Sequence, residues 1–180
     1  FNAFEARAGQ ERLQTAPGNL HFEEKYAWDL VTNETVLDCA EDLLGPNLLL
    51  LGSRSFCKYG PSDDFVAWHQ DLKYWGLDPA VAINAWLAID DADGLNSAMK
   101  VIPGSHTGHR EMTTIPSAEN AMVNKTIEIT PETQETAVTL EMKAGSVSIH
   151  DSFILHGSDA NLSDRRRAGY TIRYCSPDTA

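Results

Sequence analysis

The stretch VAINAWLAI, residues 81–89, alternates two sets of side chains over its whole length. Val81, Ile83, Ala85, Leu87 and Ile89 form one set, and the residues between them form the other. Side chains two residues apart share a face of a β-strand, so this period predicts a strand with two distinct faces.

Further short strands are expected on either side of this one. They are predicted at residues 48–59, 98–102, 138–142, 147–149, 153–156 and 168–174. Turn-forming pairs such as Pro103-Gly104 and Ala144-Gly145 separate some of these segments. Many short strands with turns between them favour a sandwich or barrel over alternating strands and helices.

One helix is expected at residues 34–44. Asn33 is a suitable N-cap, Gly45-Pro46 ends the helix, and the apolar residues between them fall on one face. Residues 1–32 show only weak periodicity, and residues 111–136 form a long polar excursion. We therefore predict a mainly β fold, specifically a double-stranded β-helix of the jelly-roll, cupin-like type with a few flanking helices.

Composition limits the classes of partner. A net charge of −12 over 180 residues disfavours binding to nucleic acid or to an anionic membrane. No run approaches the roughly 20 apolar residues of a membrane-spanning helix. The 3 cysteines lack pair spacing, so we expect a reducing, cytoplasmic location. The chain begins with Phe1, and we expect residues 1–180 to form a single domain, either whole or truncated. Composition sets no oligomeric state.

The first candidate site residues are His69 and Asp71. Residues two apart in a strand point the same way, so an extended segment would bring both side chains to one metal ion. His156, which follows another predicted strand, would supply a third ligand. Two histidines and one carboxylate leave coordination positions open, which suits Fe(II), although four-coordinate zinc sites use the same residue types. An isolated His-x-Asp is also common by chance, and His150 is expected to have a structural or supporting role near the site.

Three blocks of sequence resemble the phytanoyl-CoA dioxygenase family. They are WHQDLKYW at residues 68–75, VIPGSH at 101–106, and HGS at 156–158 followed by Asn161 and Arg167. The resemblance implies a double-stranded β-helix in which His69, Asp71 and His156 are the catalytic residues that bind Fe(II). It also implies that Arg167 holds the remote carboxylate of 2-oxoglutarate, since a guanidinium forks onto a carboxylate with two hydrogen bonds.

The resemblance also suggests lesser roles. Ser158 and Asn84 are candidate helpers in binding 2-oxoglutarate, and Arg173 is a weaker competitor for the place of Arg167. Arg165 and Arg166 are expected at a solvated edge. Where relatives often carry Glu-Asn-Gly-Cys, this chain has Leu-Asn-Ser-Ala at residues 95–98.

The activity implied is that of a dioxygenase that uses Fe(II), 2-oxoglutarate and O2 to hydroxylate a small-molecule substrate, with release of succinate and CO2. Asp71 favours hydroxylation, because related halogenases carry a small residue in place of the carboxylate ligand. Residues 111–136 are a candidate lid. Candidate substrate residues are Tyr74, Trp75 and Trp86, with Trp86 equally expected in the core. Arg110 or Lys125 could hold a small anionic substrate.

Three other hypotheses remain open at this point. A cupin-like, metal-dependent isomerase or hydrolase would have no need of Arg167 or of 2-oxoglutarate. In a non-catalytic β-sandwich binding module, His69, Asp71 and His156 would not converge. A truncated family member would fold without turning over.

Overall fold

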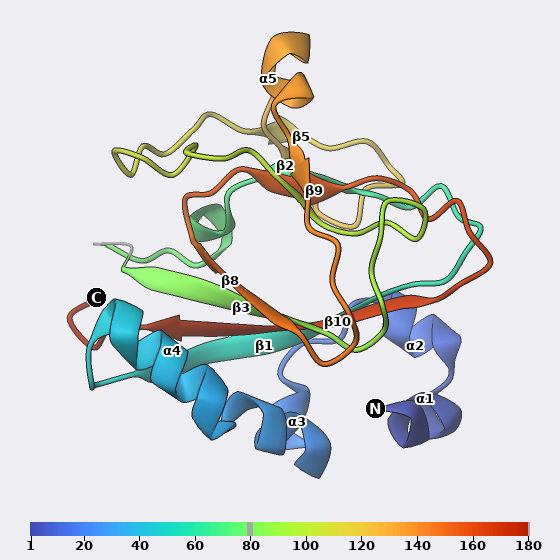
Figure 1. The fold of residues 1–180 in the computed structure, drawn as a ribbon, viewed down its shortest axis with the longest axis horizontal. Helices are drawn as coiled ribbons and strands as arrows, with labels where there is room; N and C mark the ends of the chain where they lie inside the picture. The colour runs from blue at the N-terminus through green and yellow to red at the C-terminus, as the bar shows by residue number, and fades with distance from the viewer. Residues whose placement is uncertain (79–80, 180) are drawn as a thin grey trace.

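The computed structural model describes residues 1–78 and 81–179, and its strands form two main antiparallel sheets (Figure 1). The larger sheet has the order β1-β10-β3-β8 and consists of Leu49–Lys58 (β1), Ala82–Ala88 (β3), Val147–Asp151 (β8) and Arg167–Cys175 (β10). The smaller sheet has the order β2-β9-β4-β7 and consists of Val66–His69 (β2), Lys100–Val101 (β4), Val138–Thr139 (β7) and His156–Ser158 (β9). This arrangement confirms the predicted mainly β, cupin-like fold.

Helices cover the outer face of the larger sheet, as Figure 1 shows. They are Asn2–Ala8 (α1), Gln10–Gln14 (α2), Lys25–Val31 (α3) and Glu34–Leu44 (α4), with a 3-10 turn at Leu20–Phe22 (η1). The predicted helix is confirmed with its cap, because the Asn33 side chain accepts a hydrogen bond from the Val36 N–H at 3.3 Å. The helices before it are too short for a clear apolar period to emerge from sequence.

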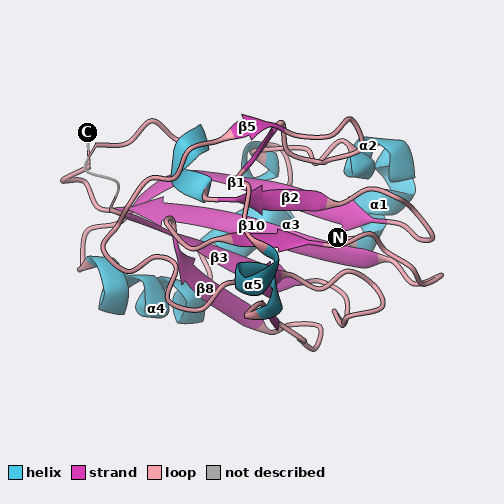
Figure 2. Cartoon of the chain, turned by 90° about the horizontal axis from the view of Figure 1, so that it is seen from above, coloured by secondary structure: helices cyan, strands magenta, loops and turns pink. Residues whose placement is uncertain are grey.

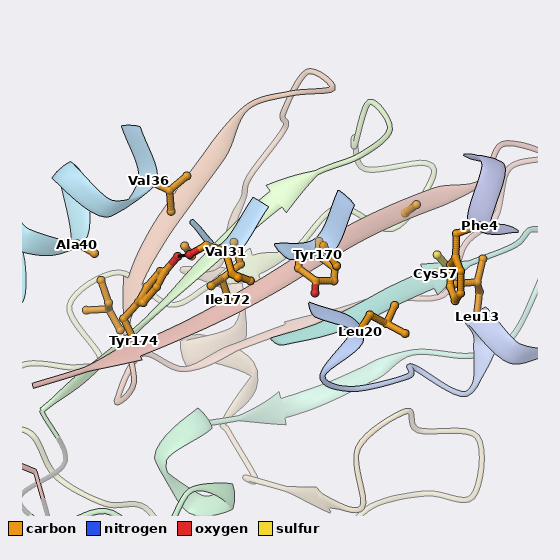
Figure 3. Packing of buried hydrophobic residues seen from close by; sticks show 14 residues of the cluster. Phe4, Leu13, Leu20, Val31, Val36, Ala40, Cys57, Tyr170, Ile172 and Tyr174 are labelled. Atoms are coloured by element: carbon orange, nitrogen blue, oxygen red, sulfur yellow. Dashed lines mark hydrogen bonds between the residues drawn. The ribbon is translucent and has the colours of Figure 1, made fainter. Parts of the chain in front are cut away.

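The main core lies between these helices and the larger sheet. Figure 3 shows Tyr170, Ile172 and Tyr174 of β10 pointing toward side chains of the helices, among them Leu20 and Val31. The Tyr174 hydroxyl donates to the Val31 carbonyl at 2.8 Å, which satisfies its one polar group. The alternate residues of β10 face the other way, and this inner face of the sheet carries the polar side chains of the site.

The predicted strand at 153–156 is wrong for most of its length. Asp151 accepts a hydrogen bond from the Phe153 N–H at 2.7 Å, and its carbonyl accepts one from the Ile154 N–H at 3.1 Å. These bonds close a turn, so β9 begins only at His156. The apolar residues of this segment are buried without being extended, a case in which an apolar run alone does not identify a strand.

The polar excursion at 111–136 contains Ile115–Pro116 (β5), Lys125–Thr126 (β6) and the short helix Pro131–Glu135 (α5). Figure 2 shows α5 in front of the long strands of the larger sheet and β5 beyond the edge of that sheet, on the side of β1. The excursion is joined to β2, since the Ile127 N–H donates to the Trp68 carbonyl at 2.7 Å. Within the described part of the chain, no helix combines the length and apolar character needed to span a membrane.

Candidate active site

The two candidate histidine ligands lie directly opposite each other on neighbouring strands. His69 ends β2 and His156 begins β9, and the two residues are paired in the register with ring centroids 4.1 Å apart. Asp71 does not continue the strand as predicted, because it begins a 3-10 turn at Asp71–Tyr74 (η2). It still reaches the histidines, since Gln70 between them keeps an extended backbone with φ −111° and ψ 135°.

Gln70 explains why the chain bends at this point. Its side-chain amide donates to the carbonyls of Phe153 at 2.8 Å and Arg110 at 3.0 Å, and its oxygen accepts from the Met112 N–H at 2.9 Å. The side chain is fully buried and all of these partners are main-chain groups. It therefore fixes the backbone between the two ligands and faces away from the metal site.

The three ligand side chains converge in a buried position. Asp71 Oδ1 lies 3.7 Å from His69 Nε2, and Asp71 Oδ2 lies 3.8 Å from His156 Nε2. One ligand atom from each residue fits within a mutual distance of 4.8 Å. Ligand bonds of about 2.0–2.2 Å to a transition metal would span these separations.

Each histidine is oriented by a backbone carbonyl two residues earlier. His69 Nδ1 lies 2.8 Å from the Ala67 carbonyl, and His156 Nδ1 lies 3.1 Å from the Ile154 carbonyl. A carbonyl only accepts, so Nδ1 carries the proton and Nε2 offers its lone pair. Burial, aided by neighbouring His69, lowers the pKa of His156 to about 3, so its ring is neutral.

Asp71 is the charged member of the group. Burial alone would raise the pKa of its carboxyl, but the surrounding rings of His156, His150 and His69 hold that pKa well below its usual value. The lone pairs of two neutral imidazoles and a carboxylate therefore face one another in a buried space. Without a cation between them, these electron-rich groups repel one another. The donor set thus fits a divalent metal ion.

Asn84 and His150 complete this end of the site from paired positions on β3 and β8. Asn84 Nδ2 donates to Asp71 Oδ2 at 2.7 Å, and His150 Nε2 lies 3.6 Å from the same oxygen. Asn84 was predicted to assist 2-oxoglutarate; here its nitrogen holds Asp71, while its Oδ1 is buried with no partner among the described residues. The supporting position expected for His150 matches this geometry.

A second cluster surrounds Ser158 at the other end of the site. Its hydroxyl lies 3.3 Å from Arg167 Nη2 and 2.9 Å from Lys58 Nζ, and both cations are almost fully buried. Burial lowers the pKa of Arg167 to about 10 and, together with the charge of Arg167, lowers that of Lys58 to about 6. No ion pair joins either cation to an acidic side chain in residues 1–78 and 81–179. Arg167 therefore stays charged near neutral pH, and a buried guanidinium without an anionic partner fits a ligand carboxylate.

Sequence analysis missed Lys58. Lys58 is two residues from Phe56, which lines the cavity, and therefore lies on the same inner face of β1. Lys58 Nζ also donates to the Ser97 hydroxyl at 2.8 Å. Ser97 stands where relatives often carry glycine and keeps the left-handed backbone that glycine favours, with φ 73°.

Both clusters open into one cavity of about 430 Å³. All three predicted substrate residues, Tyr74, Trp75 and Trp86, line it. Trp86 is also buried, with the guanidinium of Arg167 5.7 Å from the centre of its ring, as expected for a core residue, and its contact with substrate stays a prediction. The cavity lining does not include the candidate anion-binding residues Arg110 and Lys125.

The other basic residues near Arg167 point elsewhere. Arg165 is exposed and pairs with Asp93 at 2.7 Å, as expected for a solvated edge. Arg166 is half-buried and joins Asp90 at 2.7 Å and Glu5 of α1, so it links the first helix to the sheet. Neither of them lines the cavity.

The comparisons with known proteins agree with this geometry. A family model described as phytanoyl-CoA dioxygenase (PhyH) matches residues 3–169. A probable alpha-ketoglutarate-dependent hypophosphite dioxygenase of Stutzerimonas stutzeri is 30% identical over 83% of this chain and 52% of its own length. Human peroxisomal phytanoyl-CoA dioxygenase is 26% identical over 87% of this chain and 48% of its own.

Among solved structures, the non-heme monooxygenase ThoJ without ligand is similar over 99% of this chain and 66% of its own, with 28% identity and a TM-score of 0.83. The chain thus spans about half the length of the curated relatives it matches. The human relative is named as peroxisomal, so the comparisons do not confirm the cytoplasmic location expected here. The family match over nearly the whole chain and the converging His-Asp-His group show that the chain belongs to the phytanoyl-CoA dioxygenase family.

Proposed function

We propose that this chain carries the active site of an Fe(II)- and 2-oxoglutarate-dependent dioxygenase that hydroxylates a small molecule and releases succinate and CO2. The observation that carries the proposal is the pairing of two sites in one cavity. One is a two-histidine, one-carboxylate metal site, and the other is a buried arginine without an anionic partner. Such a ligand set leaves positions on the metal for a co-substrate and O2.

The role proposed for each residue follows from its position in the cavity. His69, Asp71 and His156 would hold the metal, and Asn84 would keep Asp71 turned toward it. Arg167 would bind the remote carboxylate of 2-oxoglutarate, with Ser158 and Lys58 beside it. Bound Fe(II) would supply the redox chemistry that activates O2 at the expense of 2-oxoglutarate. The aromatic residues Trp75 and Trp86 would exclude water from the reacting groups.

The alternative of a cupin-like isomerase or hydrolase explains the metal site but not the cluster around Ser158. It would use the metal site but would leave Arg167 buried without a ligand. Burying an uncompensated cation is costly, so a site that keeps Arg167 argues for an anionic co-substrate. The non-catalytic sandwich is disfavoured by the convergence of the three ligands.

The test is the visible metal-to-ligand charge-transfer band of an Fe(II)-2-oxoglutarate chelate, measured under anaerobic conditions. We expect a band in the unmodified protein, no band in His69→Ala, and a band in Arg167→Gln only at much higher 2-oxoglutarate concentration. Arg110→Gln, which changes an arginine outside the cavity, is the matched control and should behave like the unmodified protein. Folded, iron-loaded protein that shows no band with 2-oxoglutarate would refute the proposal.

A further inference from the structure

The cavity has a second positively charged end, at Arg173. Arg173 lies on the same strand face as Arg167, six residues further along β10, which corresponds to roughly 20 Å at about 3.3 Å per residue. It is paired in the register with Asn84, whose amide holds Asp71. Arg173 therefore lies near the metal ligands, whereas Arg167 lies at the far end.

The guanidinium of Arg173 is held in place but is not neutralised. It lies 5.6 Å above the Trp75 ring, and its Nε is buried without a hydrogen-bond partner among the described residues. No ion pair joins it to an acidic side chain in that part of the chain. Burial lowers the pKa of Arg173, the nearby charge of Arg54 lowers it further, and Asp71 acts in the opposite direction.

Arg54 brings a further positive charge to the same space. It lies on β1, where it is paired with Thr171 of β10, and it lines the cavity while staying largely exposed. Two arginines thus line one cavity, and the acidic residue of its lining, Asp71, belongs to the predicted metal-ligand set. An anion that bridged them would relieve their repulsion and satisfy the free Nε.

The charges expected from the proposed function reinforce this argument. Fe(II) and Arg167 would together carry three positive charges, and Asp71 and the 2-oxoglutarate dianion would carry three negative ones. The co-substrate end is then balanced before Arg173 and Arg54 are counted. Any proton that Lys58 regained beside the bound carboxylate would add to the excess of positive charge.

We propose that Arg173, with Arg54 at the exposed side of the cavity, binds an oxyanion group of the primary substrate. The substrate is then a small molecule that carries a carboxylate or a phosphorus oxyanion. This inference rests on the proposed function, because it takes Arg167 to be occupied by 2-oxoglutarate. The competing explanation is that Arg173 only supports the charge of Asp71, in which case its loss would weaken metal binding.

The experiment uses protein loaded with Ni(II), which is redox-inert here, and saturated with 2-oxoglutarate, so that the co-substrate end is filled. Inorganic phosphate, propionate and propionamide are titrated separately by calorimetry. Propionamide matches propionate in shape and lacks its charge. We expect one molecule of propionate or phosphate to bind per chain, with propionamide at least tenfold weaker; the tighter of the two anions identifies the class of oxyanion.

The variants locate the binding group. Arg173→Gln should lower anion affinity at least tenfold while the affinities for Ni(II) and 2-oxoglutarate change less than twofold. Arg173→Lys keeps the charge and should retain part of the anion affinity, and Arg110→Gln should have no effect.

Three results would overturn the inference. The first is unmodified, 2-oxoglutarate-loaded protein that binds propionamide as well as propionate. The second is an Arg173→Gln variant that loses metal or 2-oxoglutarate affinity in step with anion affinity. The third is a failure of the unmodified protein to bind Ni(II) and 2-oxoglutarate at all, which would refute the proposed function itself and is distinguishable because it precedes any anion titration.

Discussion

The two faces of β10 differ in what they contribute. On the outer face, Tyr170, Ile172 and Tyr174 are buried against the helices and find every partner within the fold. On the inner face, Arg167 and Arg173 are removed from water with nitrogen atoms that find no partner among the described residues. The polar groups of the outer face are therefore satisfied within the fold, whereas those of the inner face are left for bound ligands.

This difference predicts which substitutions should change stability and which should change ligand binding. Apolar burial on the outer face contributes the favourable free energy of folding. Polar burial on the inner face costs free energy that only ligands can recover. Substitutions on the outer face should therefore lower stability with little effect on ligand affinity, and substitutions on the inner face should do the reverse.

The largest effect is expected at Asp71. Asp71→Ala removes the only carboxylate of the predicted ligand set, so metal binding and succinate release should fall to background. The metal-free variant should unfold at about the same urea concentration as the metal-free unmodified protein, because loss of the hydrogen bond from Asn84 offsets the relief of no longer burying a carboxylate. Urea denaturation of metal-free protein and metal titration check the two parts separately. Strong destabilisation of the metal-free variant would contradict the contrast between the faces.

The next effect is expected at Ile172, which is fully buried on the outer face. Ile172→Ala should lower the free energy of unfolding by about 3 kcal/mol, from lost apolar burial and the cavity left behind. The 2-oxoglutarate affinity of the folded protein should stay within about twofold. Leu162→Ala, at a side chain that is 72% exposed, is the control and should change stability by less than about 0.5 kcal/mol. A loss of 2-oxoglutarate affinity comparable to that of Arg167→Gln would show that the faces are coupled.

These faces also mark how far sequence alone could lead. The alternation at residues 81–89 was sufficient to predict β3, and Asn33 with Gly45 was sufficient to predict the two ends of α4. Both patterns are local in the sequence. The triad needed three matched blocks, since nothing in His69-Gln70-Asp71 itself states that His156 lies opposite. Even then, Asp71 reaches the site through a turn held by Gln70, whose partners are distant main-chain groups that no local pattern reveals.

Lys58, and the position of Arg173 near the metal ligands, could not be predicted for a different physical reason. A lysine or arginine in a strand is usually solvated, and only the closure of the second sheet over the larger one buries these two. The orienting partners of the histidines are backbone carbonyls, which any sequence supplies. Residue type and the matched blocks therefore predicted the three converging side chains, while their charge and orientation depend on tertiary packing.

Lys58 gives a pH-dependent test of the inner face. Its folded pKa of about 6 lies below the unfolded value, so the unfolded chain binds more protons between about pH 6 and pH 10. This group therefore makes the ligand-free protein more stable as pH rises through that window, and Lys58→Met should remove that contribution.

A carboxylate bound nearby would raise the pKa of Lys58, so 2-oxoglutarate should bind with proton uptake and about tenfold more weakly at pH 8.5 than at pH 6.5. Calorimetry in buffers of different ionisation enthalpy measures the uptake, and equal uptake in Lys58→Met would assign it to another group.

The smallest effect on stability is expected at Asn33, the N-cap of α4. Asn33→Ala leaves the Val36 N–H without its side-chain acceptor, and loss of such a cap costs about 1 kcal/mol. Asn33→Asp or Asn33→Ser keeps an acceptor and should recover most of that stability in urea denaturation. None of the three variants should alter the affinity for 2-oxoglutarate or for propionate, since α4 packs on the outer face of the larger sheet, away from the cavity. If the Ala variant weakened either ligand while the Asp variant did not, the outer helices would have to be counted among the elements that position the inner face.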